Sequence, residues 1–183
     1  LQVLRRPIVR LLITGDELVV PGHSRRDDQI YESNSLMLSA LAVRDGGVLE
    51  PPLPIEPVSD DRKTISSLLS RPGADVVLVS GGTSVGTEDH APTLVTELGE
   101  LVFHGVAMRP SSPTGIGRVG DALVFLLPGN PVSCLAAYDV FAGETVRRMG
   151  GKVPDWPYTR ITAILDDKIA SDIGRLDYCR VSI

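Results

Sequence analysis

The sequence predicts an α/β protein: a three-layer, doubly wound, mostly parallel sheet with helices on both faces, followed by the start of a small β domain. Short aliphatic runs, IVRLLIT at 8–14, ADVVLVS at 74–80 and ALVFLL at 122–127, are typical of strands buried on both faces. Helical patterns alternate with these runs, which favours a parallel sheet. After residue 151 the segments WPYTRITAIL and LDYCRVSI resemble antiparallel strands. We therefore expect an α/β domain over 1–151 and, over 152–183, a linker with an incomplete C-terminal β domain.

Capping and breaking residues delimit the other elements. Asn34 can cap a first helix that ends at the glycine pair 46–47. Four prolines between 51 and 57 favour an extended segment over 48–58. Asp60 is expected to cap a second helix, which ends at Pro72. A third helix is expected over 92–99, an extended segment over 101–108, a loop over 109–120, and a long helix over 131–149 with proline in its first turn.

Composition excludes several classes of protein. The chain has 183 residues, of which 43% are hydrophobic and 22% charged, so it is expected to fold rather than remain disordered. The net charge of −5 has the wrong sign for a general binder of nucleic acid backbones. We find no apolar run near the roughly 20 residues of a membrane helix, and we expect a cytoplasmic protein. Cys134 and Cys179 lack metal-ligand spacing and are interpreted as reduced thiols, Cys134 as a small buried residue.

The first loop of interest, Gly15-Asp16-Glu17, follows the first strand. In a doubly wound sheet, ligands bind beyond the carboxyl ends of the strands, where such loops gather. Two adjacent carboxylates there suit Mg²⁺, which takes one or two protein carboxylates and completes its shell with water and phosphate. Taken alone, the motif favours the alternative of a solvated acidic turn or a helix cap.

The second loop runs from Ser80 to Asp89 with the sequence SGGTSVGTED. Its glycines allow backbone N–H groups to approach an anion, and its hydroxyls can donate to phosphate oxygens. Asp89 beside such a phosphate site argues for a metal ion. A loop whose glycines only turn the chain is an equally supported alternative when this loop is taken alone.

The third loop, LPGNPVS at 127–133, delivers the N-terminus of the long helix. The first amides of that helix lack internal partners, so an anion site is possible, and Ser133 can face the same crevice. A well-made structural connection is the preferred alternative for this loop in isolation.

Together, ITGDEL, QIYESN, SGGTSVGTED and LPGNPVS, in this order, resemble the molybdopterin-binding domain of molybdenum cofactor biosynthesis proteins, and more narrowly the molybdopterin molybdenumtransferase (MoeA or gephyrin E-domain) family. The resemblance covers residues 7–151. It implies that adenylylated molybdopterin is bound and that molybdate is inserted with release of AMP, assisted by Mg²⁺. It also implies a homodimer, and the adenylyltransferase of the pathway is a further expected partner. The implied catalytic and metal-binding residues are Asp16, Glu17 and Asp89, and the implied substrate-binding residues are Asn34, Ser80, Gly81, Gly82, Thr83, Ser84, Gly86, Arg109, Pro128, Gly129, Asn130, Pro131 and Ser133.

One segment departs from the family pattern. Where typical members read Lys-Pro-Gly-Lys-Pro, this chain has Arg109-Pro110-Ser111-Ser112-Pro113, so one positive charge is lost. Two alternatives to an insertase therefore stay open. One is an enzyme like the molybdopterin adenylyltransferases, against which the PGNPVS loop and the C-terminal segment argue. The other is a non-catalytic module for pterin binding or dimerisation, which the two serines favour.

Overall fold

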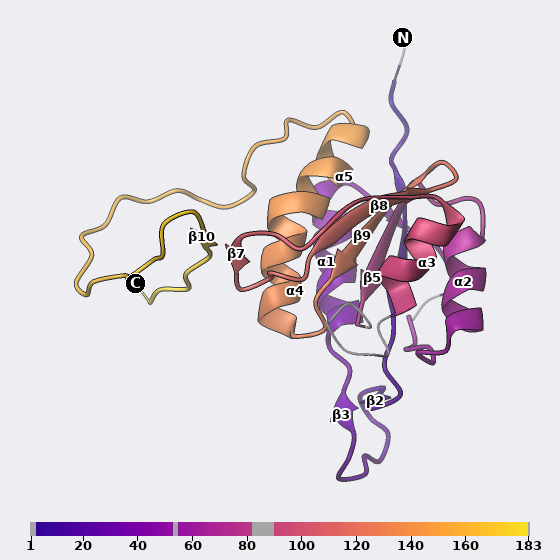
Figure 1. Cartoon of the computed structure of the whole chain (residues 1–183). Helices are drawn as coiled ribbons and strands as arrows, with labels where there is room; N and C mark the ends of the chain where they lie inside the picture. Colours follow the sequence, from indigo (N-terminus) through magenta and orange to yellow (C-terminus); the bar gives the residue numbers. More distant parts are fainter. Residues whose placement is uncertain (1–2, 53–54, 82–89, 183) are drawn as a thin grey trace.

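The computed structural model describes residues 3–52, 55–81 and 90–182. Within them, six strands form one sheet (Figure 1). In spatial order they are β4 (Val48–Leu49), β1 (Ile8–Ile13), β5 (Val76–Ser80), β9 (Ala122–Leu127), β8 (Gly115–Val119) and β6 (Glu100–His104). The first four are parallel, whereas β8 pairs antiparallel with both β9 and β6. The expected mostly parallel sheet is confirmed.

Helices cover both faces of the sheet (Figure 1). One face carries α1 (Asn34–Asp45) and the long C-terminal helix, which comprises α4 (Pro131–Ala137), the π-helical turn η1 (Tyr138–Ala142) and α5 (Gly143–Met149). The other face carries α2 (Arg62–Ser70) and α3 (His90–Leu98). The layers are therefore helix, sheet and helix, as expected.

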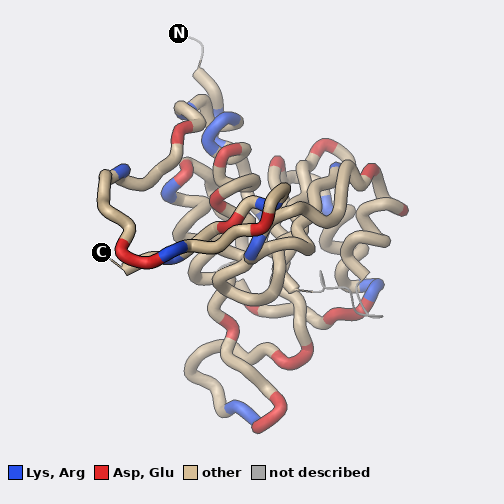
Figure 2. Tube along the Cα trace, turned by 60° about the vertical axis from the view of Figure 1, so that its left-hand side comes forward, with Lys and Arg blue, Asp and Glu red and all other residues tan. Residues whose placement is uncertain are grey.

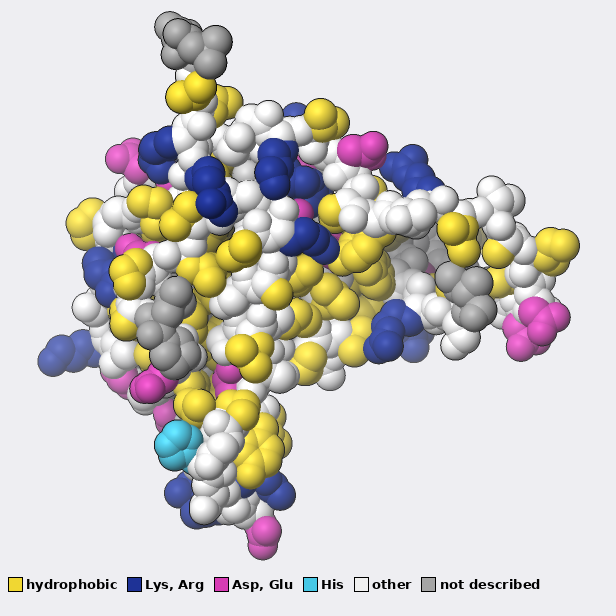
Figure 3. Space-filling view, turned by 180° about the vertical axis from the view of Figure 1, so that it is seen from behind, with side chains coloured by type: hydrophobic (Ala, Val, Ile, Leu, Met, Phe, Trp, Pro, Cys, Tyr) yellow, Lys and Arg dark blue, Asp and Glu magenta, His cyan; other side chains and the backbone are white. Residues whose placement is uncertain are grey.

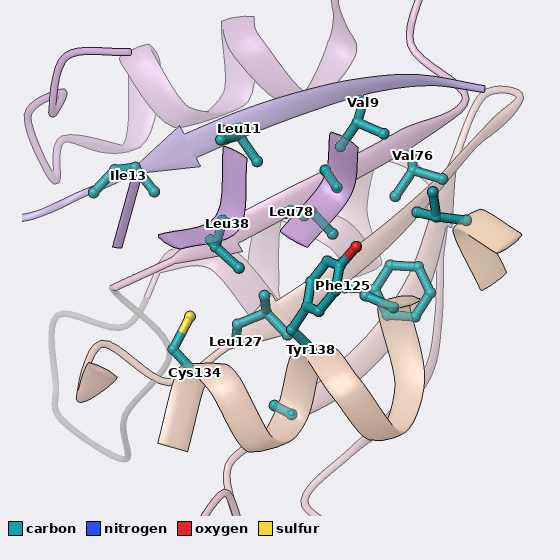
Figure 4. Packing of buried hydrophobic residues seen from close by; sticks show 14 residues of the cluster. Val9, Leu11, Ile13, Leu38, Val76, Leu78, Phe125, Leu127, Cys134 and Tyr138 are labelled. Carbon is teal, nitrogen blue, oxygen red and sulfur yellow. The ribbon is translucent and has the colours of Figure 1, made fainter. Parts of the chain in front are cut away.

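Two apolar cores result from the alternation of side chains along the central strands. In β5, Val76 and Leu78 point toward α1 and the long helix, while Val77 and Val79 point toward α2 and α3. Figure 4 shows the first core, where Tyr138 of η1 packs beside side chains of β5 and β9. Because both faces are covered, the central strands are aliphatic at almost every position.

Strand β8 corrects the expected loop over 109–120. The sequence GIGRV did not predict a strand, because two of its five residues are glycines, which are rare in strands. Packing explains Gly117: a Cβ there would lie 2.4 Å from Cγ1 of Val95 on α3 and 2.6 Å from the carbonyl oxygen of Glu100 on β6. A glycine thus allows the close approach of helix and strand that sequence propensity penalises.

The antiparallel strands expected after residue 151 are wrong for the described chain. Over 152–182 the structure has the single short strand β10 (Leu176–Asp177), which pairs in parallel with β7 (Met108–Arg109). Elsewhere in this segment many apolar side chains are solvent-exposed; Ile164 is 98% exposed. Figure 3 shows hydrophobic side chains at the surface of the molecule. Apolar alternation alone does not make a strand without a neighbouring backbone to pair with. The domain boundary near residue 151 stays a prediction.

A projection formed by β2 (Leu18–Val19) and β3 (Ile30–Tyr31) extends beyond the carboxyl end of the sheet (Figure 1). Basic and acidic residues are interspersed along the trace, including at the tip of this projection (Figure 2). In the described ranges, the helices are all too short or too polar to cross a membrane.

Candidate functional site

A cavity of about 720 Å³ lies at the carboxyl ends of the three central strands. Because Ile13 of β1, Ser80 of β5 and Leu127 of β9 are in register, the three strand ends are level and the loops after them meet. The described lining residues are Ile13, Thr14, Glu17, Leu18, Ile30, Tyr31, Glu32, Ser33, Asn34, Asp60, Ser80, Gly81, Pro110, Ser111, Ser112, Pro113, Pro128, Gly129, Asn130, Pro131 and Ser133.

Asn34 joins two of the loops. Its Nδ2 donates to Ser80 Oγ at 2.9 Å and to the Gly129 carbonyl oxygen at 2.8 Å. This corrects the expected helix cap: Ser33 is the N-cap residue, and the carboxylate of Glu32 accepts the Ser35 amide at 2.7 Å. Because Glu32 satisfies that amide, the Asn34 side chain is free to hold the second and third loops together.

Three polar atoms in residues that line the cavity are buried and have no hydrogen-bond partner among the described residues. They are Thr14 Oγ1, Asn34 Oδ1 and Asp60 Oδ1. A buried polar atom left unpaired costs about 1–3 kcal/mol, so such atoms mark a place where a ligand can contribute the missing bond. Thr14 is 2% and Asn34 7% exposed, so bulk water has little access to these two side chains.

Asp60 is a lining residue that sequence reasoning assigned to another role. The cap of α2 is its neighbour Asp61, whose side chain accepts the Thr64 amide at 2.9 Å. Either aspartate of the pair could cap the helix by sequence, and only the path of the chain decides between them. The sequence did contain a signal for this role. A helix needs only one capping side chain, so the second of the two adjacent aspartates was available for the cavity.

The acidic pair of the first loop is divided by the structure. Both carboxylates are exposed, but only Glu17 lines the cavity, and Asp16 is absent from the described lining. Gly15 has φ +150°, and a Cβ there would lie 2.7 Å from Glu17 Oε2. Within the described residues, no three His, Cys, Asp or Glu side chains gather as a metal site. Asp89, the third predicted ligand, lies outside the described residues, so this site stays a prediction.

The second loop is described only at its beginning, where Ser80 and Gly81 line the cavity. Gly81 has φ +95°, and a Cβ there would lie 2.1 Å from the Thr14 carbonyl oxygen, so no other residue fits. The predicted contacts Gly82, Thr83, Ser84 and Gly86 lie outside the described residues.

All five predicted residues of the third loop line the cavity: Pro128, Gly129, Asn130, Pro131 and Ser133. Asn130 caps α4, and its Oδ1 accepts the amides of Val132 at 3.1 Å and Ser133 at 3.4 Å. These two first-turn amides are therefore already paired, and an anion at this helix end would have to compete with the cap.

The opposite wall is formed by residues 110–113. Ser111 is 3% exposed, has φ +96°, and donates through Oγ to the Ser133 carbonyl oxygen at 2.6 Å. Arg109, a predicted contact, is exposed on β7 and is absent from the described lining. Its side-chain role stays a prediction.

Cys134 lies beneath the cavity, with Sγ 3.7 Å from Ser80 Oγ. Burial raises the pKa of its thiol to about 12. The thiolate, the nucleophilic form, is therefore scarce at neutral pH, in agreement with the expectation that Cys134 is a buried structural residue.

Comparison with known proteins agrees with this geometry. Residues 10–148 match the family model described as a probable molybdopterin binding domain. The chain is 35% identical to Molybdopterin molybdenumtransferase 2 of Mycobacterium tuberculosis over 98% of this chain and 45% of that protein. It is 32% identical to Molybdopterin molybdenumtransferase of Nostoc sp., over 97% of this chain and 41% of the relative.

A solved structure has the same fold. It is the molybdopterin biosynthesis MoeA protein from Pyrococcus horikosii, with a TM-score of 0.69 and 32% identity, covering 81% of this chain and 36% of that one. The chain thus spans less than half the length of the curated relatives it matches. The resemblance inferred from the four motifs is confirmed, and the chain belongs to the molybdopterin-binding domain family of molybdenum cofactor biosynthesis proteins.

Proposed function

We propose that this chain binds adenylylated molybdopterin in the cavity and takes part in the Mg²⁺-dependent insertion of molybdate, with release of AMP. The observation that carries the proposal is the cavity at the ends of β1, β5 and β9, with its three unpartnered buried polar atoms. The names of the relatives, molybdopterin molybdenumtransferases, support the choice of substrate.

The described residues suit a polar substrate that carries phosphate. Asn34 Oδ1 can accept an N–H or O–H of the substrate, because its Nδ2 is already bonded to Ser80 and Gly129. Thr14 Oγ1 can donate or accept. Gly81 brings backbone close to the cavity without a side chain, which suits a phosphate group.

The carboxylates of the site fit a hard cation. Glu17 reaches the cavity from the first loop, and Asp60 offers a buried oxygen without a partner in the described chain. We assign Mg²⁺ to Asp16, Glu17 and Asp89, with Asp60 as a further carboxylate at the same cavity. When bound, the cation would offset negative charge on the phosphates of the substrate and of the departing AMP.

The remaining parts of the proposal concern the oligomeric state, the partner enzyme and the location of the protein in the cell. We also propose a homodimer, contact with the molybdopterin adenylyltransferase and a cytoplasmic location; the contact is supported by the reaction, in which the product of one enzyme is the substrate of the next. Both cysteines are unpaired, which suits a reducing compartment.

The decisive experiment incubates the 183-residue chain with adenylylated molybdopterin, molybdate and Mg²⁺, and measures AMP by chromatography and binding by calorimetry. Mg²⁺-dependent AMP release is the expected result. Binding without release would refute catalysis by this chain and support the non-catalytic binding module. Neither binding nor release would refute the proposed function.

Two adjacent aspartates provide a matched pair of variants. Asp60→Asn removes a charge from the cavity, whereas Asp61→Asn removes the same charge at the cap of α2, where asparagine also caps. We expect AMP release to fall at least about tenfold in Asp60→Asn, because one charge-assisted contact is worth about 1.5–3 kcal/mol. Asp61→Asn is expected to keep the original rate. Equal rates for both variants would remove Asp60 from the site.

A further inference from the structure

The C-terminal segment, residues 156–178, returns to the α/β body at the wall of the cavity. Strand β10 lies beside β7 (Figure 1), and the Leu176 amide donates to the Ala107 carbonyl oxygen at 2.8 Å. Two residues on, the Tyr178 amide donates to the Arg109 carbonyl oxygen at 2.7 Å. Arg109 directly precedes the lining residues 110–113, so this bond holds the start of the wall.

Side chains of the same segment are bound to the long helix. Asp139 of η1 is 1% exposed, and its Oδ2 accepts the hydroxyls of Tyr158 at 2.8 Å and Tyr178 at 3.3 Å. Trp156 packs against both tyrosines, with ring centroids 5.6 Å and 6.5 Å apart. Arg44 of α1 completes the cluster by donating to Asp139 Oδ1 at 3.2 Å and to the Tyr158 hydroxyl at 2.9 Å.

Tyr178 therefore contacts two elements that lead into the lining of the cavity. Its backbone holds Arg109 at the base of the wall, and its hydroxyl holds Asp139 on the helix whose first turn contains Ser133. The wall and that helix are joined again by the bond from Ser111 Oγ to the Ser133 carbonyl oxygen. These contacts link the wall formed by residues 110–113 to β10 and to the long helix.

The wall needs such support because its backbone is strained. Ser111 has φ +96°, a conformation that L-residues rarely adopt and that the surrounding structure must hold. We propose that residues 156–178 brace this wall and that Tyr178 is a positioning residue for the cavity. The proposal rests on the proposed function only in treating this cavity as the binding site.

Hydrogen exchange measured by mass spectrometry on the 183-residue chain tests the brace directly. The amides of Val106 and Thr114 report on the wall, because they donate to the carbonyl oxygens of Ser112 and Ser111. Trp156 is the only tryptophan, so its emission reports whether the segment is docked. The variants are Tyr178→Ala and, as the matched control in the same segment, Ile173→Ala, whose side chain is fully exposed.

In Tyr178→Ala we expect exchange over residues 105–114 to quicken about tenfold and Trp156 emission to shift to longer wavelength, while β5 and β9 keep their protection. Both variants keep the backbone amide; Tyr178→Phe also keeps the ring beside Trp156 and loses only the hydroxyl bond to Asp139, so its exchange is expected to quicken less than that of Tyr178→Ala. Ile173→Ala is expected to match the unchanged chain. A Trp156 shift without faster exchange at 105–114 would overturn the proposal, as would unchanged Trp156 emission in Tyr178→Ala.

A binding measurement extends the test to the cavity. We expect the dissociation constant of AMP, measured with Mg²⁺, to rise several-fold in Tyr178→Ala and to stay unchanged in Ile173→Ala. If the unchanged chain does not bind AMP, the proposed function loses support, whereas the exchange data still decide whether the brace exists. An equal dissociation constant in all the chains would refute the role of Tyr178 in positioning the site.

Discussion

Replacing Asn34 by alanine is expected to destabilise the protein by about 2–3 kcal/mol. The side chain is 7% exposed and makes two hydrogen bonds, at 2.9 Å to Ser80 Oγ and at 2.8 Å to the Gly129 carbonyl oxygen. Each such bond contributes about 1 kcal/mol, and the loss of this donor at the Ser80 hydroxyl, which is 1% exposed, adds to the cost. For a chain of this length, the melting temperature should fall by about 4–12 °C.

Urea unfolding followed by circular dichroism measures this loss. Asn130→Ala is the matched control, because Asn130 is an exposed cap of α4, worth about 1 kcal/mol. If Asn34→Ala lies within about 0.5 kcal/mol of the unchanged chain, which is the range of ordinary surface substitutions, Asn34 does not join the two loops and the reasoning is refuted.

The variant Asn34→Asp separates the donor from the shape of the side chain. A carboxylate would point an oxygen at the Gly129 carbonyl, so only the protonated acid restores a donor there. Burial and this contact raise the pKa of the new carboxyl in the folded state. The folded state then binds the extra proton, so stability is highest below the usual aspartate pKa of about 4 and falls as the pH rises. A pH-independent loss would contradict this account.

Three further predictions concern stability and reactivity. Glu50→Ala should cost about 3 kcal/mol in urea unfolding, because Arg10 is 3% exposed and loses its counter-charge. Hydrogen bonds from Arg10 hold the pKa of Glu50 below its usual value. The stability that Glu50 contributes is therefore complete above about pH 4.5 and is lost as the pH falls further. A difference in unfolding free energy between the two chains that stays constant down to pH 2 would contradict this prediction. Ellman's reagent should label Cys179 in the folded chain, and Cys134 only after unfolding, since burial raises the pKa of Cys134 to about 12. Ser111→Gly should leave the unfolding free energy nearly unchanged, because relief of about 1 kcal/mol of strain at φ +96° offsets one lost hydrogen bond. Ser111→Ala loses the same bond without that relief and should be destabilised by about 1 kcal/mol or more. Equal stability of the two variants would show that the backbone there is unstrained.

Local signals in the sequence were sufficient for the sheet and for the place of the site. Aliphatic runs at 8–14, 74–80 and 122–127 predicted β1, β5 and β9, because strands buried on both faces have apolar side chains at almost every position. Glycines and prolines directly after these runs located the three loops. Parallel strands in register then bring the loops to one edge, where the cavity lies.

Only the tertiary structure decided which polar side chains face the cavity. Asn34 and Asp60 both satisfy the local rules for helix caps, yet Glu32 accepts the first-turn amide of α1 and Asp61 caps α2, which leaves the two side chains free. The partners of Asn34 lie 46 and 95 positions away in the chain. The same holds for Tyr178, whose contacts with Arg109 and Asp139 depend on the return of the C-terminal segment. Local propensity carries no information about such distant partners, because they exist only once the loops have closed and the strands have paired.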